Sequence, residues 1–240
     1  MKFASATQKR HYVRTMFARI ARRYDLMNRL MTFGQDRRWR RVLVRTAALP
    51  HGGRFLDVAT GTGDVAYIAA READPSGLIV ALDLVPVMLH LARRRTGEST
   101  QQSRPVWTVG DAMCLPFASD TFDAVASAFL MRNVTDVAAA LREQVRVTRH
   151  GGRVLFLEVP KPTGKTIWNR LFHLYFRWIV PILGQVITGD KDAYKYLPVS
   201  AETFLTMDQL QSIMESVGLR QVRCYPFIFG SVVIYAAVKP

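Results

Sequence analysis

A glycine-rich turn and the acidic side chains around it are the residues of this sequence best suited to chemistry. Residues 56–64 read Leu-Asp-Val-Ala-Thr-Gly-Thr-Gly-Asp, and Gly61 and Gly63 let the backbone approach a ligand that a Cβ atom would block. Asp83 stands 20 residues after Gly63, which suits a carboxylate that accepts hydrogen bonds from both ribose hydroxyls. The pattern therefore predicts a nucleoside-binding site.

The charge around this turn favours one kind of nucleoside over another. Residues 61–66 also satisfy the dinucleotide pattern Gly-x-Gly-x-x-Gly/Ala, in which a pyrophosphate binds bare N–H groups at a helix N-terminus. Asp57 and Asp64 flank the turn and would repel that anion by about 1 kcal/mol or more at ~4–6 Å. S-adenosylmethionine carries a sulfonium and an ammonium instead, and both are attracted by carboxylates. Asp111 follows the third apolar run and can reach an adenine amino group, although Asp64 and Asp111 also suit a helix start and a turn.

Short apolar runs alternate with helical patterns through the middle of the chain, which predicts a parallel sheet with crossover helices. We expect strands at 55–59, 78–82, 106–109, 124–128 and 154–159, and helices at 64–73, 86–95 and 135–148. Residues 4–45 have helical spacing interrupted at Gly34, which predicts two or three helices. The chain closes with a predicted helix at 207–217 and strands at 220–225 and 231–238, an antiparallel pair at the sheet edge.

Composition limits the class of protein. The chain has 240 residues, of which 49% are hydrophobic, so it is not wholly disordered and is long enough for a buried core. Its two cysteines, Cys114 and Cys224, lie far apart with no histidine cluster nearby. We therefore expect no disulfide scaffold and no metal site, and a reducing, cytoplasmic location.

Basic residues are concentrated at the N-terminus. Residues 1–50 contain 13 lysines and arginines but only two acids, in a chain with a net charge of +14. Such a segment needs an anionic partner or a solvated surface. Charge alone leaves nucleic acid, an anionic lipid face and an acidic substrate open.

Residues 166–187 form a strongly aromatic segment with helical character. Arg170, Arg177, Pro181 and Gly184 interrupt it and argue against a transmembrane span. The segment suits a wall for an isoprenoid tail or a contact with a lipid surface. A dimer contact or core packing are equally consistent with its composition.

Stretches outside the glycine-rich turn are similar to those of a known family. Tyr24–Asn28 reads Tyr-Asp-Leu-Met-Asn and Arg132–Asp136 reads Arg-Asn-Val-Thr-Asp, and further matches occur at 31–34, Trp39, 115–117, 151–153, Glu158, 161–162 and 194–197. With these motifs the whole chain resembles the ubiquinone/menaquinone biosynthesis C-methyltransferases. The resemblance implies an α/β, Rossmann-like class I methyltransferase sheet with helices on both faces, an N-terminal helical segment and a helical lid. The seven strands would be mostly parallel with the last antiparallel, and the reaction would methylate a ring carbon of a prenylated quinol.

The resemblance also implies roles for individual residues. Arg132 and Tyr24 are expected to be catalytic, Arg132 by stabilising a phenolate oxygen. The acceptor would contact Asn28, Phe129, Asn133, Tyr194 and Tyr196. The methyl donor would contact Asp57, Gly61, Thr62, Gly63, Asp83, Leu84, Asp111, Ala112 and Ala128. Arg132 is alternatively a structural partner of Asp136, and the general base is open among Asp36, His11, Tyr24 and a water held by Asp83.

Some positions depart from the family pattern. Asp36 stands where the family signature has His, and Ala128 where many members have Ser. Val159-Pro160 replaces the usual Phe-Ser, and Phe129–Met131 lacks the Gly usual before Arg132. These changes leave the fold and donor expectations intact and bear on the acceptor.

We expect one methyltransferase domain over 1–240. It comprises a basic helical segment at 1–50, a donor-binding core at 51–160, an aromatic lid at 161–200 and a C-terminal helix with edge strands at 201–240. The partners expected are a prenylated quinol or other lipophilic small molecule, with contact to the inner membrane face and a homodimer both open. Alternatives are another phenol or a phospholipid amine as acceptor. Specific nucleic-acid binding is not expected, because Ser127–Leu130 lacks the Asn/Asp-Pro-Pro-aromatic motif of amino-methylating enzymes.

Overall fold

One twisted sheet organises the chain. The structure is a computed structural model that describes residues 3–72, 76–96, 104–161 and 174–240. Seven strands pair in the order β3-β2-β1-β4-β5-β7-β6. They are β1 (Arg54–Val58), β2 (Leu78–Asp83), β3 (Val106–Val109), β4 (Phe122–Ala128), β5 (Thr148–Glu158), β6 (Arg220–Phe227) and β7 (Val232–Val238). Only β7 is antiparallel to its neighbours, β5 and β6, as predicted.

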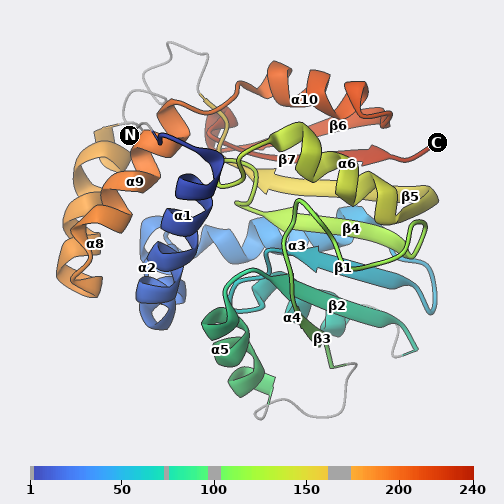
Figure 1. Cartoon of the computed structure of the whole chain (residues 1–240), viewed down its shortest axis with the longest axis horizontal. Coiled ribbons are helices and arrows are strands. Elements are labelled where there is room, and N and C mark those ends of the chain that lie inside the picture. Colours follow the sequence, from blue (N-terminus) through green and yellow to red (C-terminus); the bar gives the residue numbers. More distant parts are fainter. Residues whose placement is uncertain (1–2, 73–75, 97–103, 162–173) are drawn as a thin grey trace.

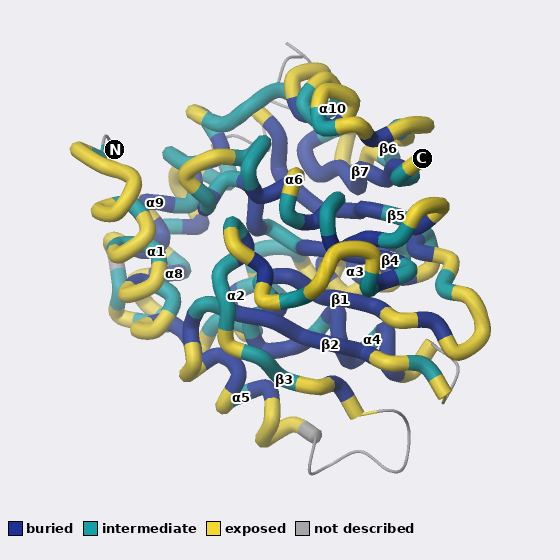
Figure 2. Tube along the Cα trace, turned by 45° about the vertical axis from the view of Figure 1, so that its right-hand side comes forward, coloured by how far each residue is buried: buried dark blue, intermediate teal, exposed yellow. Residues whose placement is uncertain are grey.

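Helices cover both faces of the sheet, which confirms the predicted α/β class. The helices α3 (Gln35–Ala47) and α4 (Asp64–Glu72) pack on one face, and α6 (Val137–Val147) and α10 (Met207–Ser216) on the other. The helix α5 (Pro86–Thr96) lies along β2 and β3. The central strands are buried along most of their length (Figure 2), because both of their faces are covered.

A second group of helices gathers beyond one end of the sheet. It contains α1 (Ala6–Ile20), the 3₁₀ turn η1 (Ala21–Arg23), α2 (Tyr24–Met31), α8 (Val180–Thr188) and α9 (Lys191–Glu202). The parallel strands point toward this group, at the left of Figure 1. Ligands bind at the carboxyl ends of strands in open α/β sheets, so this group stands over the expected site.

The aromatic segment differs in part from the sequence expectation. Residues 166–173 of the predicted helix at 166–187 lie outside the described residues. The remainder forms a π-helical turn, η2 (Tyr175–Ile179), that leads into α8, and the separate helix α9 was not predicted. Among the described helices, none has the length and apolarity needed to cross a bilayer.

Candidate active site

A cavity lies at the carboxyl ends of β1 to β4, where the sequence predicts the nucleoside. We call it the donor cavity. Six of the predicted donor contacts line it, namely Gly61, Asp83, Leu84, Asp111, Ala112 and Ala128. These residues come from separate segments that end at the same sheet edge, so the topology brings them together.

Asp83 is fixed at the end of β2 by backbone groups. Its Oδ2 accepts the Gly61 N–H at 2.7 Å, and its Oδ1 accepts the Val85 N–H at 2.8 Å. Burial raises the pKa of Asp83 to about 6, although these N–H groups oppose the rise. The side chain is therefore a preformed carboxylate at neutral pH in the wall of the donor cavity.

Three predicted donor contacts lie behind the turn rather than in the cavity wall. Asp57 is buried, and its Oδ2 accepts the Thr60 hydroxyl at 2.5 Å and the Ala66 N–H at 3.1 Å. Burial raises the pKa of Asp57 to about 7. Its Oδ1 has no hydrogen-bond partner in the described part of the chain. Gly63 has a φ of +89°, and a Cβ at this position would lie 2.6 Å from the Trp107 ring. The neighbouring Trp107 side chain, rather than a ligand, therefore explains the glycine.

Asp64 and Thr62 correct the sequence analysis. Asp64 does not face the donor, because Arg29 and Arg95 bind its carboxylate at 2.8 and 3.0 Å. Thr62 turns its hydroxyl away from the cavity and donates to Asp25 at 2.5 Å. The electrostatic preference for a cationic nucleoside therefore depends on Asp83, with Asp57 behind the turn, and not on Asp64; Asp111 is itself paired with Arg10 at 2.8 Å.

The first helix covers the donor cavity, which the sequence did not predict. Arg10, Val13, Arg14 and Phe17 of α1 line it. Arg10 reaches Asp111 at 2.8 Å, and Lys9 donates to the backbone carbonyls of residues 132 and 134. No local signal marks this role, because the helical spacing of α1 defines a face but not its target.

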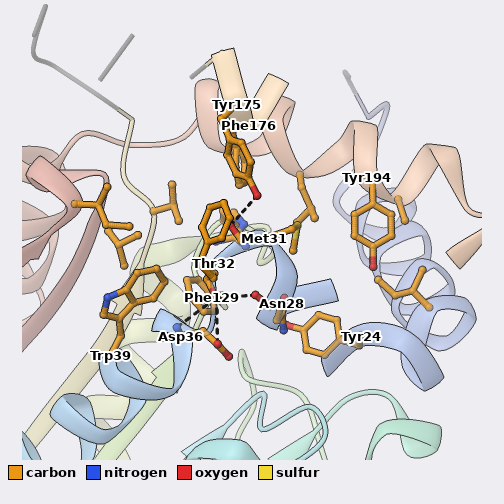
Figure 3. A pocket seen from close by; sticks show the side chains of 18 of the residues that line it. Tyr24, Asn28, Met31, Thr32, Asp36, Trp39, Phe129, Tyr175, Phe176 and Tyr194 are labelled. Atoms are coloured by element: carbon orange, nitrogen blue, oxygen red, sulfur yellow. Dashed lines mark hydrogen bonds between the residues drawn. The ribbon is translucent and has the colours of Figure 1, made fainter. Parts of the chain in front are cut away.

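A second cavity of about 360 Å³ adjoins the first, and we call it the acceptor cavity. Its walls are largely aromatic and aliphatic, and come from α1, α2, α3, α9, η2 and the η3 turn (Ile228–Gly230) (Figure 3). Phe17, Tyr24 and Phe129 line both cavities, so the two spaces meet at these side chains. A lipophilic ring in the second space would thus face a ligand in the first.

Arg132 lies in the wall of the acceptor cavity with a buried acidic partner. Its Nη1 donates to Glu158, whose side chain is fully buried at the end of β5. The guanidinium also stands 5.3 Å from the centre of the Phe129 ring. The alternative pairing with Asp136 is wrong, because Asp136 caps α6 through the Ala139 N–H at 2.9 Å. The buried apolar run before Glu158 could have indicated this carboxylate.

Three buried polar atoms of acceptor-cavity residues have no partner among the described residues. They are Asn28 Nδ2, Arg132 Nε and the Tyr194 hydroxyl. All three can donate a hydrogen bond, and an unpaired buried donor costs about 1–3 kcal/mol. Burial raises the pKa of Tyr24, which lies beside Asn28, so this phenol also stays protonated. The unpaired polar groups in the wall of this cavity are therefore hydrogen-bond donors.

Two predicted acceptor contacts lie elsewhere. Tyr196 points away from the cavity and donates to Asn133 Oδ1 at 3.2 Å. Side chains two positions apart on a helix point about 200° away from each other, so Tyr196 and Tyr194 face different sides of α9. Asn133 lines the donor cavity instead and donates to the Phe129 carbonyl at 2.9 Å, so it holds the loop after β4.

The candidate bases differ in their surroundings. Asp36 is fully buried in the acceptor-cavity wall, and its carboxylate is bound by Arg29, Arg40 and the Thr32 hydroxyl. These contacts occupy both oxygens, so Asp36 holds α2 to α3. His11 is exposed and lines neither cavity.

Solved structures share the fold at low sequence identity. The cyclase SpnF superposes with a TM-score of 0.67 at 18% identity, covering 98% of this chain and 96% of its own. The Haemonchus contortus phosphoethanolamine N-methyltransferase 2, solved with S-adenosylhomocysteine, has a TM-score of 0.60 at 18% identity over 82% of this chain and 51% of its own. These similarities support the class I methyltransferase fold.

Sequence relatives are much closer. The Roseiflexus castenholzii demethylmenaquinone methyltransferase is 42% identical over 234 residues, 97% of this chain and 95% of that protein. The Geobacter sulfurreducens ubiquinone/menaquinone biosynthesis C-methyltransferase UbiE is 40% identical over 233 residues, 97% of this chain and 90% of that protein. The sequence model of the ubiE/COQ5 methyltransferase family matches residues 5–239. This chain belongs to the ubiE/COQ5 methyltransferase family.

Proposed function

We propose that this methyltransferase transfers a methyl group from S-adenosylmethionine to a ring carbon of a prenylated quinol. The reaction is demethylmenaquinol to menaquinol or the equivalent benzoquinol step. The observation that carries the proposal is the junction of two unlike cavities at Phe17, Tyr24 and Phe129. One offers carboxylates to a cationic nucleoside, and the other offers unpaired hydrogen-bond donors in an apolar space.

The polarity of the acceptor cavity distinguishes a quinol from a phospholipid amine. An ammonium or amine acceptor needs oxygen acceptors near the reacting nitrogen. The two fully buried carboxylates near this cavity, Asp36 and Glu158, are already bound by arginines. The unpaired groups are N–H and O–H donors, which suit the oxygens of a phenol or phenolate.

The chain's residues contribute positioning and charge. The sulfonium compound, when bound, supplies an activated methyl group. Holding donor and ring in line can contribute roughly 7–11 kcal/mol. A phenol has a pKa of about 10, and the Arg132 guanidinium favours the phenolate that makes the adjacent ring carbon nucleophilic. Carbon–carbon bond formation breaks the sulfur–methyl bond, and the ring then loses its hydrogen as a proton.

The test is a labelling experiment. The protein is incubated with methyl-labelled S-adenosylmethionine and a reduced demethylmenaquinone analogue, and mass spectrometry locates the new methyl group. We expect it on the ring carbon beside the prenylated one. Methylation of oxygen or nitrogen, or no product, would remove the quinol from consideration.

We further propose that an anionic lipid surface binds beside the mouth of the acceptor cavity. An apolar stripe on η2 and α8, made of Leu174, Trp178, Ile179, Ile182 and Val186, is exposed, with Val186 at 77%. Tyr175 and Phe176 of the same turn line the cavity. Residues 174–189 contain no acid, and Arg177 is exposed among them. An isoprenoid tail could then pass from the bilayer into the cavity without crossing water.

Vesicle flotation tests this surface. Phosphatidylcholine vesicles with added phosphatidylglycerol should retain the protein, and the double variant Trp178→Ser/Ile182→Ser should bind them at least about a hundredfold more weakly, since each buried side chain contributes about 1.5–3 kcal/mol. Val106→Ser, on the exposed end of β3, is the matched control. Flotation unchanged by the double variant contradicts the proposal. If the wild-type protein has the mass of a dimer in solution and the double variant has the mass of a monomer, the stripe is a homodimer contact instead.

A further inference from the structure

The helix α2 supplies two side chains of the acceptor cavity, and its first residue lies on the glycine-rich turn of the donor site. Tyr24 and Asn28 line the acceptor cavity (Figure 3), and Tyr24 also lines the donor cavity. Gly61 has a φ of +58°, and a Cβ at this position would stand 3.8 Å from Cε1 of Tyr24. The Tyr24 ring therefore packs over the backbone of the turn at Gly61.

The next residue of α2 contacts the next residue of the turn. The Thr62 hydroxyl donates to Asp25 Oδ1 at 2.5 Å, and Thr62 is only 5% exposed. The other carboxylate oxygen of Asp25 lies 3.5 Å from Nη1 of Arg95 on α5. Arg95 also donates to the Thr62 carbonyl at 2.9 Å, so the helix and the turn share one cation.

An ion pair one helical turn further along α2 sets the direction of the helix. Nη2 of Arg29 pairs with Asp64 at 2.8 Å, and Asp64 is the first residue of α4. Residues 24, 25 and 29 of α2 thus contact residues 61, 62 and 64 in the same order along the chain. Because the helix is held at two separate points, it cannot slide or rotate over the turn without losing a hydrogen bond to a charged group.

The opposite side of the same turn belongs to the donor cavity. The Gly61 N–H donates to Asp83 Oδ2 at 2.7 Å, and both residues line that cavity. Only Gly61 and Thr62 therefore separate Asp83, the carboxylate in the donor cavity, from Asp25, the carboxylate that holds α2. A ligand that packs against Gly61 thereby steadies the turn on which the position of Tyr24 depends.

We infer that Asp25 is a positioning residue that couples the donor turn to α2 through the Thr62 hydroxyl. Asp25 lines neither cavity, and it acts through the adjacent Tyr24, which stands where the two cavities meet. A misplacement of about 1 Å near reacting groups can lower turnover by about a hundredfold. The inference requires the methyl donor, and it does not depend on the identity of the acceptor.

The experiment removes one hydroxyl. Thr62→Val deletes it and keeps the branched shape of the side chain, and Thr62→Ser restores it. Thr148→Val is the matched control, because Thr148 is fully buried, donates to the Gln144 carbonyl at 2.6 Å and lines neither cavity. Hydrogen exchange of the amides of residues 24–31 is measured with and without saturating S-adenosylhomocysteine. Calorimetry measures the affinity of that compound for each protein.

We expect S-adenosylhomocysteine to slow exchange in α2 at least about tenfold more in wild type, Thr62→Ser and Thr148→Val than in Thr62→Val, the worth of a hydrogen bond to a charged group. Its dissociation constant should stay within about twofold in all four proteins. A merely structural hydroxyl would speed exchange equally with and without the ligand, and an unchanged slowing in Thr62→Val would overturn the inference. An affinity that falls tenfold in Thr62→Val would make Thr62 a donor contact and would also overturn it.

A double-mutant cycle with Asp25→Ala assigns the effect to this pair. Turnover of the reduced demethylmenaquinone analogue should fall about tenfold in Asp25→Ala and in Thr62→Val, and no further in the double variant, because all three lack the same hydrogen bond. Additive losses would show that the two residues act separately and would contradict the inference. If wild type does not methylate the quinol, the proposed function fails, while the exchange measurements still decide the role of Asp25.

Discussion

The two cavities of this protein are built in opposite ways. The donor cavity sits on strand ends, and its key group, Asp83, is a hydrogen-bond acceptor with negative charge, whereas Asp111 is paired with Arg10. The acceptor cavity is enclosed by helices, and its unpaired groups, on Asn28, Arg132 and Tyr194, are donors in an apolar space. Each cavity thus offers the complement of one reactant, a cation on one side and a ring bearing oxygens on the other.

The difference explains how one chain keeps two reactants apart until they meet. The Asp83 carboxylate in the donor cavity attracts a cationic nucleoside and repels a phenolate. Among the described residues, only Phe17, Tyr24 and Phe129 line both cavities, and their aromatic side chains make the junction apolar. Variants that change one cavity should therefore leave binding in the other nearly intact.

The largest effect is expected at Arg132. Replacing it alone would leave Glu158 buried and unpaired, which costs about 3–5 kcal/mol of stability, so we choose Arg132→Met/Glu158→Gln. We expect kcat to fall by about 10²–10³-fold, as for loss of one oxyanion-stabilising group. Calorimetry should find donor affinity within about twofold of wild type.

Glu158→Gln alone is the control for folding of the β5 end. If donor affinity and kcat of the double variant fell by the same factor, Arg132 would belong to donor binding or to folding. That result would contradict the assignment of Arg132 to the acceptor cavity alone.

Asp83 provides the reciprocal test on the donor side. Asp83→Asn removes the charge that faces the ribose, and we expect the dissociation constant of S-adenosylmethionine to rise roughly 10- to 150-fold, the range for hydrogen bonds to charged groups. Acceptor affinity should hardly change. Asp64→Asn serves as the comparison, since its carboxylate faces arginines, and an equal loss there would contradict the assignment.

A smaller effect is expected from pH. Because burial raises the pKa of Asp83 to about 6 and of Asp57 to about 7, both lose charge as the solution is acidified. Donor affinity should fall by up to tenfold per pH unit for each group between about pH 7 and about pH 5. Calorimetry across this range should show the fall, and a flat profile would contradict it. Tyr24 and Tyr194, whose pKa values are raised, stay protonated throughout.

The same two carboxylates should make the ligand-free protein less stable as the pH rises, although donor affinity increases over the same range. Their folded-state pKa values exceed the usual carboxyl value of about 3.8. The folded state therefore holds more protons than the unfolded state in that window, and stability falls as pH rises from about 4 to about 7. Thermal unfolding with and without the donor separates the two trends, since a bound cation should offset the loss.

The sheet and the donor cavity were largely predictable from the sequence, for a physical reason. A buried parallel strand leaves a local apolar run, and the residue that follows it must lie at the ligand-binding edge. Asp83, Asp111 and Gly61 follow from that rule alone. The errors at Thr62 and Asp64 arose because their hydrogen-bond partners, Asp25 and Arg29, come from a distant helix.

The acceptor cavity was less predictable, because its walls are helix faces chosen by long-range packing. Tyr194 and Tyr196 carry the same side chain in one motif, yet only Tyr194 lines the cavity. The sequence suggests Asp136, four residues away, as the partner of Arg132. In the structure the partner is Glu158 at the end of β5. The cover formed by α1 over the donor cavity left no local signal at all.

The position of β7 has a consequence for synthesis of the chain. The described residues of the donor cavity lie between Arg10 and Thr135, whereas the acceptor cavity is lined by both Met16 and Val232. Of the described strands, β7 is made last, and it inserts between two strands already made, β5 and β6. The chain up to Thr135 therefore contains every described residue of the donor cavity before the acceptor cavity can be complete.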